Sequence, residues 1–132
     1  MPRNAPTILV ADDEEMVLNF VGLVLKKAGF HVLPAHGGAA ALKLCRDGAE
    51  ELDLALLDIV MPQMDGPQLC TRLRTAYPNL RVIFMSGFSE EEVSRRCGDV
   101  PELAEFLKKP FTAAELVARV KRMMDRPLTF GA

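Results

Sequence analysis

Short apolar runs alternate along the chain with longer segments in which apolar residues recur every three or four positions. The runs read TILVA at 7–11, HVLP at 31–34, LALL at 54–57, RVIFM at 81–85 and AEFL at 104–107. Runs that are apolar throughout are typical of strands covered on both faces, as in a parallel sheet. Pro34 cannot donate to a strand ladder, so the second strand is expected at a sheet edge.

An amphipathic helix is expected after each run. The first covers 14–28 before Gly29, with apolar residues at Met16, Val17, Phe20, Val21, Val24 and Leu25. The second covers 37–48, and the third starts at Asp65, with Pro67 in its first turn and apolar residues at Leu69, Cys70 and Leu73.

Two further helices are predicted from their capping residues. Ser89 with Glu92 reads as a capping box for a short helix that ends near Gly98. Thr112 with Glu115 reads as a second box. The buried stripe expected on this last helix, which ends by Pro127, consists of Leu116, Val117, Val120, Met123 and Met124.

Strands that alternate strictly with helices predict an α/β fold with a parallel sheet and helices on both faces. For five such pairs the natural choice is the flavodoxin-like (βα)5 three-layer sandwich, with strand order 2-1-3-4-5. The chain has 132 residues, the length of one ordinary domain. We expect that domain to span residues 1–126, followed by a C-terminal tail at 127–132.

The composition is that of a soluble globular protein without an electrostatic preference for nucleic acid. The chain has 16 basic and 18 acidic side chains, which gives a formal charge of −2. No segment approaches the roughly 20 apolar residues of a membrane span, and no signal peptide is evident, so we expect a cytoplasmic protein without membrane contact. The three cysteines form no C-x-x-C pair, and Cys45 and Cys70 are expected to be packing residues.

Polar side chains stand where four of the predicted strands end. Asp12 and Asp13 follow the first strand, Asp58 the third, Ser86 the fourth and Lys109 the fifth. The carboxyl ends of parallel strands share one edge of the sheet, where open α/β folds bind their ligands. The sequence therefore predicts a site at this edge.

The chemistry of these residues suits a metal ion and a phosphoryl group. Three neighbouring carboxylates repel one another, and Mg²⁺, or Mn²⁺ in its place, lets all of them stay ionised. Asp13 and Asp58 are candidate direct ligands, Asp12 a direct or water-mediated one, and Val60 a ligand through its backbone carbonyl. Lys109 and the hydroxyl of Ser86 would then meet phosphoryl oxygens. With such neighbours, the Asp58 carboxylate could form an aspartyl phosphate.

Each residue also has a plain structural interpretation when taken alone. Asp12 or Asp13 could cap the first helix, and Asp58 could be a turn residue at a strand end. Lys109 alone would be a solvated lysine, and Phe106 a core residue, because aromatic residues in strands usually pack. The joint arrangement carries the functional interpretation.

Four stretches resemble, in order and spacing, the signatures of response-regulator receiver domains. They read ILVADDEE, LLDIVMPQMDG, FMSGFS and FLKKPF, and the resemblance spans about residues 6–126. It implies that Asp58 is the phosphoacceptor, Asp12 and Asp13 the acidic metal-binding pair, Ser86 the switch hydroxyl, Lys109 the partner of the phosphoryl group and Phe106 the switch aromatic. It also implies a cis peptide bond between Lys109 and Pro110.

By this resemblance the chain is a phosphorylation-activated signalling switch of a two-component system. A sensor histidine kinase or a phosphotransfer protein would donate the phosphoryl group. The chain would be no enzyme beyond catalysing its own phosphorylation and dephosphorylation. An output partner or a second copy would meet the face formed by the fourth helix, the fifth strand and the fifth helix.

Three other interpretations remain open. The chain could be a receiver excised from a hybrid sensor histidine kinase. It could be a phosphohydrolase with an aspartate nucleophile, of the haloacid-dehalogenase kind, although that family places a second aspartate two residues after the first, where this chain has Val60. It could also be an interaction module that keeps the fold without the switch, although such a module would be expected to lose Asp58, the acidic pair or Lys109.

Overall fold

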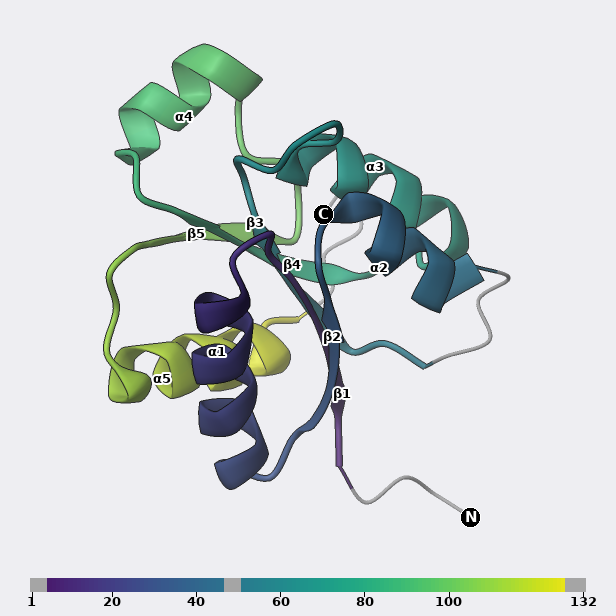
Figure 1. Ribbon diagram of the computed structural model, residues 1–132, viewed down its shortest axis with the longest axis vertical. Coiled ribbons are helices and arrows are strands. Elements are labelled where there is room, and N and C mark those ends of the chain that lie inside the picture. The colour runs from purple at the N-terminus through teal and green to yellow at the C-terminus, as the bar shows by residue number, and fades with distance from the viewer. Residues whose placement is uncertain (1–4, 47–50, 128–132) are drawn as a thin grey trace.

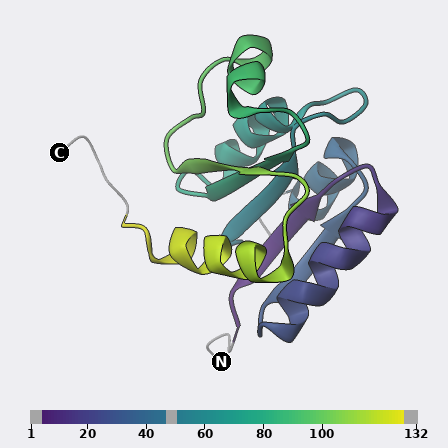
Figure 2. The same ribbon diagram turned by 90° about the vertical axis from the view of Figure 1, so that its left-hand side faces the viewer.

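The computed structural model describes residues 5–46 and 51–127, and in them a parallel sheet lies between two layers of helices (Figures 1 and 2). The strands are β1 (Thr7–Ala11), β2 (His31–Ala35), β3 (Leu54–Asp58), β4 (Arg81–Ser86) and β5 (Ala104–Lys108). Their order is β2-β1-β3-β4-β5, which confirms the predicted flavodoxin-like fold. The strand that contains Pro34 is an edge strand, as predicted, and pairs only with β1.

Helices α1 and α5 cover one face of the sheet, and the other helices lie on the opposite side (Figure 1). Their bounds are α1 (Glu15–Lys27), α2 (Gly38–Cys45), α3 (Gly66–Ala76), α4 (Glu90–Cys97) and α5 (Ala113–Asp125). The last two positions predicted for the second helix, 47 and 48, lie outside the described residues. No helix in the described ranges is long and apolar enough to cross a bilayer.

The sheet separates two hydrophobic cores, because successive side chains of a strand point to opposite faces. In β1, Ile8 and Val10 pack toward α1 and α5, whereas Leu9 and Ala11 pack toward α2 and α3. All five residues of β1 and all five of β3 are buried. This burial on both faces explains why the strands are apolar throughout.

The helix caps differ in detail from those predicted. The hydroxyls of Ser89 and Thr112 accept the backbone N–H groups of the residues three positions on, which is half of a capping box. The reciprocal pair is formed at α3, where Asp65 and Gln68 each accept the backbone N–H of the other. The sequence predicted that α3 starts at Asp65 but not that a capping box forms there. Glutamine can close a capping box as well as glutamate can, so Gln68 was the available signal.

Helix α1 buries a narrower face than its apolar residues suggested. Its buried residues are Leu18, Val21, Gly22 and Leu25. Met16 is 83% exposed and Phe20 is 43% exposed, so α1 carries apolar residues outside the core. Cys45 and Cys70, in contrast, are both buried packing residues, as predicted.

Candidate functional site

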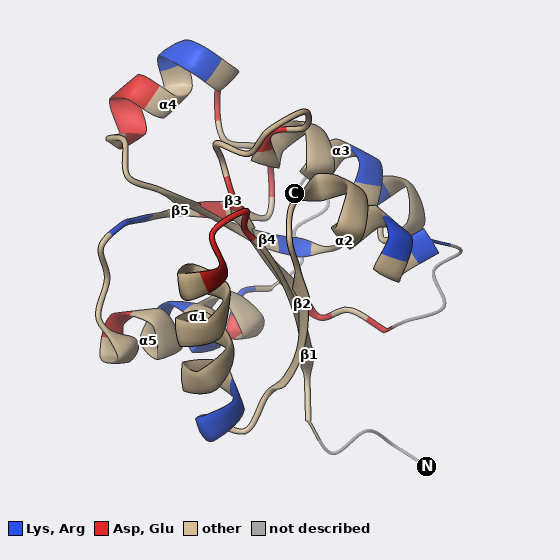
Figure 3. Cartoon of the chain, viewed as in Figure 1, with Lys and Arg blue, Asp and Glu red and all other residues tan. Residues whose placement is uncertain are grey.

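The strand ends bring the predicted polar residues together. Asp12 and Asp13 follow β1, and Lys109 follows β5. Asp58 and Ser86 do not follow β3 and β4, as the sequence suggested, but are the last residues of these strands. Figure 3 shows the acidic link between β1 and α1 lying beside the end of β3. After β1 the chain continues to β2 on one side of the sheet, and after β3 it continues to β4 on the other side. The site therefore lies at the topological switch point of the sheet, between the carboxyl ends of β1 and β3.

The carboxylates of Asp12, Asp13 and Asp58 form one cluster, in which one oxygen of each lies within 4.8 Å of the others. The ammonium of Lys109 lies 2.9 Å from Oδ2 of Asp12 and 3.3 Å from Oδ1 of Asp58. The side chain of Asp12 is fully buried and that of Asp58 is 8% exposed, whereas Asp13 is exposed. One ammonium group thus faces two buried carboxylates.

The burial and charges of this cluster shift the pKa values of Asp58 and Lys109. Burial raises the pKa of Asp58 to about 7, and the negative charge of Asp12 adds to this effect, while Lys109 opposes it. For Lys109, burial alone would lower the pKa, but the hydrogen bonds and charges of Asp12 and Asp58 outweigh it and raise the pKa. A further cation at the carboxylates would relieve the cost of ionised Asp58.

Asp12 also shapes the chain next to the cluster. Its Oδ1 accepts the backbone N–H of Glu14 at 2.9 Å, and Glu14 is the N-cap residue of α1. Neither aspartate is therefore the N-cap, which answers the structural alternative raised for Asp12 and Asp13. The second oxygen of Asp12 faces Lys109, so one carboxylate both fixes the turn and joins the cluster.

The backbone around Asp58 and Lys109 is held by hydrogen bonds between strand ends. The N–H of Lys109 donates to the carbonyl of Ser86 at 2.7 Å, and the N–H of Gly66 donates to that of Ile59 at 2.9 Å. A Cβ at Gly66 would lie 2.6 Å from the backbone oxygen of Asp58, so this position requires glycine. This requirement was not predicted, although the Asp-Gly pair at the start of α3 signals it in the sequence. The Lys109–Pro110 peptide bond is cis, as the resemblance implied.

Ser86 and Phe106, the two predicted switch residues, lie on the neighbouring strands β4 and β5. Ser86 is 1% exposed, and its Oγ accepts the N–H of Phe88 at 2.9 Å. Phe106 lies in β5, is half-buried and packs against the core on the side of α2 and α3. Its carbonyl accepts a hydrogen bond from Arg119 at 2.6 Å. The side chain of Val60 is 52% exposed, and its carbonyl remains a predicted metal ligand.

An ionic cluster on the face of α4, β5 and α5 was not predicted. Glu105 in β5 pairs with Arg119 at 3.2 Å, Arg122 at 2.5 Å and Arg126 at 3.7 Å. Burial acts to raise the pKa of Glu105, but the hydrogen bonds and charges of Arg122 and Arg119 lower it overall. The available signal was the spacing of the three arginines, which places them on one side of α5.

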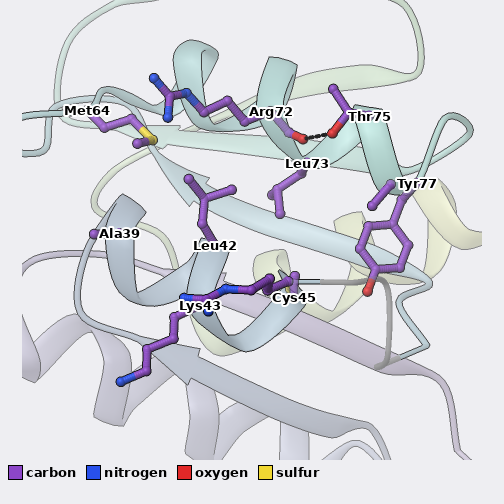
Figure 4. Close-up of a pocket in the computed structure, with 11 residues that line it drawn as sticks. Ala39, Leu42, Lys43, Cys45, Met64, Arg72, Leu73, Thr75 and Tyr77 are labelled. Atoms are coloured by element: carbon purple, nitrogen blue, oxygen red, sulfur yellow. Dashed lines mark hydrogen bonds between the residues drawn. The ribbon is translucent and has the colours of Figure 1, made fainter.

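A separate hollow of about 430 Å³ lies between α2 and α3. Figure 4 shows apolar side chains such as Leu42, Leu73 and Tyr77 around it, with Lys43 and Arg72 at its sides. None of the predicted site residues lines it. The functional interpretation therefore rests on the acidic cluster and not on this hollow.

Known proteins are similar to this chain in sequence and in fold. The chain is 36% identical over 117 residues to the response regulator receiver protein CpdR of Brucella abortus (strain 2308), across 89% of this chain and 95% of that protein. It is 35% identical over 122 residues to the sensor kinase CckA of the same organism, across 91% of this chain but only 13% of the kinase.

A crystal structure of a response regulator receiver protein from Sinorhizobium medicae WSM419 superimposes with a TM-score of 0.81 at 34% identity, covering 92% of this chain and 96% of that one. The family model described as response regulator receiver domain matches residues 8–121. These matches agree with the strand order and with the cluster at the strand ends, and the chain belongs to the response regulator receiver domain family.

Proposed function

We propose that this chain is a signalling switch that accepts a phosphoryl group on Asp58. The observation that carries the proposal is the position of the Asp58 carboxylate, which ends β3 among two further carboxylates and the ammonium of Lys109. A buried carboxylate with a pKa of about 7 is costly to ionise. A residue with only a structural role in a turn would not need a carboxylate in such a costly place.

The donor set fits a hard divalent cation. Three carboxylate oxygens lie within 4.8 Å of one another, and in the part of the chain that the structure describes the ammonium of Lys109 alone pairs with two of these carboxylates. We propose that Asp12, Asp13 and Asp58, with the backbone carbonyl of Val60, hold Mg²⁺, or Mn²⁺ in its place. When bound, the ion would neutralise negative charge between the carboxylates and an anionic phosphodonor.

The proposed reaction is a phosphoryl transfer between two proteins. An Oδ atom of Asp58 forms a bond to phosphorus as the bond from phosphorus to the donor histidine nitrogen breaks, and the nitrogen keeps the electron pair. Lys109, already within reach of Asp58, pairs with the oxygens of the transferred group, and the Ser86 hydroxyl donates to another of them. Hydrolysis of the acyl phosphate returns Asp58 to its carboxylate. No other catalytic activity is proposed for this chain.

An apolar surface beside Lys109 supports a protein as the donor. A hollow of about 380 Å³ is lined by residues of α1 and of the link to α5, namely Glu14, Met16, Val17, Phe20, Lys109, Pro110 and Phe111. Met16 is almost fully exposed, and the rings of Phe20 and Phe111 lie 6.4 Å apart. Exposed apolar residues next to a reactive group are typical of a protein contact. We therefore place the histidine kinase or phosphotransfer protein here.

The face of α4, β5 and α5 is the proposed output surface. Phe106 and Glu105 are neighbours in β5, and Arg119 contacts both of them. A change at Phe106 would therefore disturb the ionic cluster around Glu105. An output partner or a second copy of this chain would read that change.

The domain bounds and two kinds of relative bear on how this receiver is used. We propose that residues 1–126 form the receiver and that 127–132 are a tail. The match with CpdR covers 95% of that response regulator receiver protein. The match with CckA covers 13% of the kinase, which supports the proposal that a receiver of this kind can belong to a hybrid sensor kinase.

The test is uptake of one phosphoryl group from acetyl phosphate, followed by intact-mass spectrometry. The parent chain should gain one group in the presence of Mg²⁺ and none in excess chelator. Asp58→Asn should gain none under either condition, while Asp99→Asn, in the exposed link before β5, should behave as the parent. Equal labelling of Asp58→Asn and the parent would refute the assignment of Asp58.

A further inference from the structure

The hydroxyl of Ser86 is held in a turn between β4 and α4. Its Oγ accepts the backbone N–H of Phe88 at 2.9 Å, and the residue is 1% exposed. A rotation of Ser86 about χ1 moves Oγ and breaks this hydrogen bond. The position of Phe88 therefore helps to decide where the Ser86 hydroxyl points.

Phe88 is in turn held by an arginine of α4. The guanidinium carbon of Arg96 lies 4.5 Å from the centre of the Phe88 ring, within the range of a cation–π contact. Arg96 also lies 3.4 Å from the carboxylate of Glu92, one turn earlier in the helix. The ring itself is half-buried against the core on the side of α2 and α3. The Phe88 ring thus contacts both Arg96 and the core.

Helix α4 has few other attachments. Val93 is its one buried residue, and Figure 1 shows the helix standing away from the layer formed by α2 and α3. The contact between Arg96 and Phe88 therefore joins a loosely packed helix to the residue whose N–H fixes Ser86. A shift of α4 and a turn of the Ser86 hydroxyl are linked through this contact.

We propose that Arg96 is a positioning residue that holds Ser86 in its resting arrangement through Phe88. The inference rests on the proposed phosphorylation of Asp58 and concerns the regulation of that site. Because the contact stabilises the resting state, its loss increases the fraction of molecules in which Ser86 is free to meet the phosphoryl group. A cation–π contact at an exposed site corresponds to an effect of about two- to fivefold.

The experiment compares Arg96→Met with Arg95→Met. Both remove one positive charge from the same end of α4, but only Arg96 covers Phe88. The rate constant of self-phosphorylation from acetyl phosphate at saturating Mg²⁺ should rise about two- to fivefold in Arg96→Met, relative to Arg95→Met. Arg96→Lys, which keeps a cation, should lie between the parent and Arg96→Met.

A double-mutant cycle tests whether Arg96 acts through the ring. Phe88→Leu should raise the rate as Arg96→Met does, and the two changes together should give no further increase. Phe88→Tyr, which keeps the ring, should behave as the parent. Additive effects of Phe88→Leu and Arg96→Met would overturn the proposal.

A second readout needs no phosphoryl donor. Hydrogen exchange of the Phe88 amide should be faster in Arg96→Met than in Arg95→Met, because the N–H loses its partner more often. If the parent takes up no phosphoryl group, the proposed function fails, and this comparison still decides whether Arg96 holds the turn. Equal exchange of the Phe88 amide in the two variants would refute the inference.

Discussion

The ammonium of Lys109 lies 2.9 Å from the carboxylate of Asp12, 97 positions away in the sequence. The same ammonium reaches Asp58 at 3.3 Å, so it links the ends of β1, β3 and β5 in one cluster. Because both carboxylates are almost fully removed from water, this lysine determines how much negative charge the folded site can carry.

Lys109→Ala should therefore weaken the fold and disable the switch while it leaves metal binding in place. Without the ammonium, the buried carboxylates of Asp12 and Asp58 lose a hydrogen-bond donor, and the free energy of unfolding in chelator should fall by about 1 to 3 kcal/mol. Denaturant unfolding measures this loss, and amide spectra of α4 and α5 follow the switch.

Lys108→Ala is the control for that prediction, because Lys108 is the exposed neighbour of the same strand end. It should unfold and switch as the parent does. Full phosphorylation-dependent changes in the spectra of Lys109→Ala would refute the role assigned to Lys109.

Asp58→Asn should stabilise the metal-free protein above neutral pH. The folded protein raises the pKa of Asp58 from 3.8 to about 7, so between these values the folded state binds a proton that the unfolded state has lost. Stability from this group is therefore lost as pH rises from about 4 to 7, and the asparagine removes the loss.

The expected gain for Asp58→Asn is up to about 4 kcal/mol at pH 8 in chelator, and it should vanish near pH 4. Unfolding in urea at several pH values gives the profile. Asp99→Asn, which removes an exposed carboxylate, should show no comparable pH-dependent gain. A gain of equal size at pH 4 and pH 8 would show that packing, and not ionisation, is its cause.

Gly66→Ala should destabilise the protein although it lies at the start of a helix. The added Cβ would lie 2.6 Å from the Asp58 carbonyl oxygen and 3.0 Å from Cα of Ile59, both backbone atoms, so β3 and α3 would have to move apart. We expect a loss of about 1 to 3 kcal/mol in thermal or urea unfolding, with weaker Mg²⁺ binding because Asp58 is displaced.

Gly22→Ala is the matched control for Gly66→Ala. A Cβ there would meet its nearest neighbour, Val32, at 4.0 Å, and the position lies within α1. It should keep or raise stability, by up to about 1 kcal/mol, because alanine favours a helix over glycine. Equal effects of the two substitutions would contradict the clash at Gly66.

Phe20→Glu should impair phosphorylation by a protein donor and leave that by acetyl phosphate unchanged. The ring is 43% exposed and lines the hollow beside Lys109, so a charge there should disturb docking with little effect on the core. With a phosphorylated phosphotransfer protein that modifies the parent chain, the initial rate should fall at least about tenfold.

Leu44→Glu is the control, because it also places a glutamate at an apolar position of similar exposure, on α2. It should be phosphorylated by the protein donor as fast as the parent. If both glutamate variants are slowed equally, the donor does not dock on the surface of Met16 and Phe20.

Local rules of the chain determined much of what was found. Runs that are apolar throughout indicated strands buried on both faces, and their alternation with helices indicated parallel crossovers. The parallel sheet, with the strand that contains Pro34 at its edge, was therefore predictable. The strand ends then placed Asp12, Asp58 and Lys109 at one edge, because all carboxyl ends of a parallel sheet share it.

Tertiary structure alone decided the contacts between residues far apart in the chain. Sequence periodicity gave α1 an apolar face without showing that Met16 and Phe20 would lie outside the core, because burial depends on which helix packs beside it. The spacing of residues could not reveal that Lys109 reaches both Asp12 and Asp58. Such contacts depend on the crossing of elements in space, which no local preference encodes.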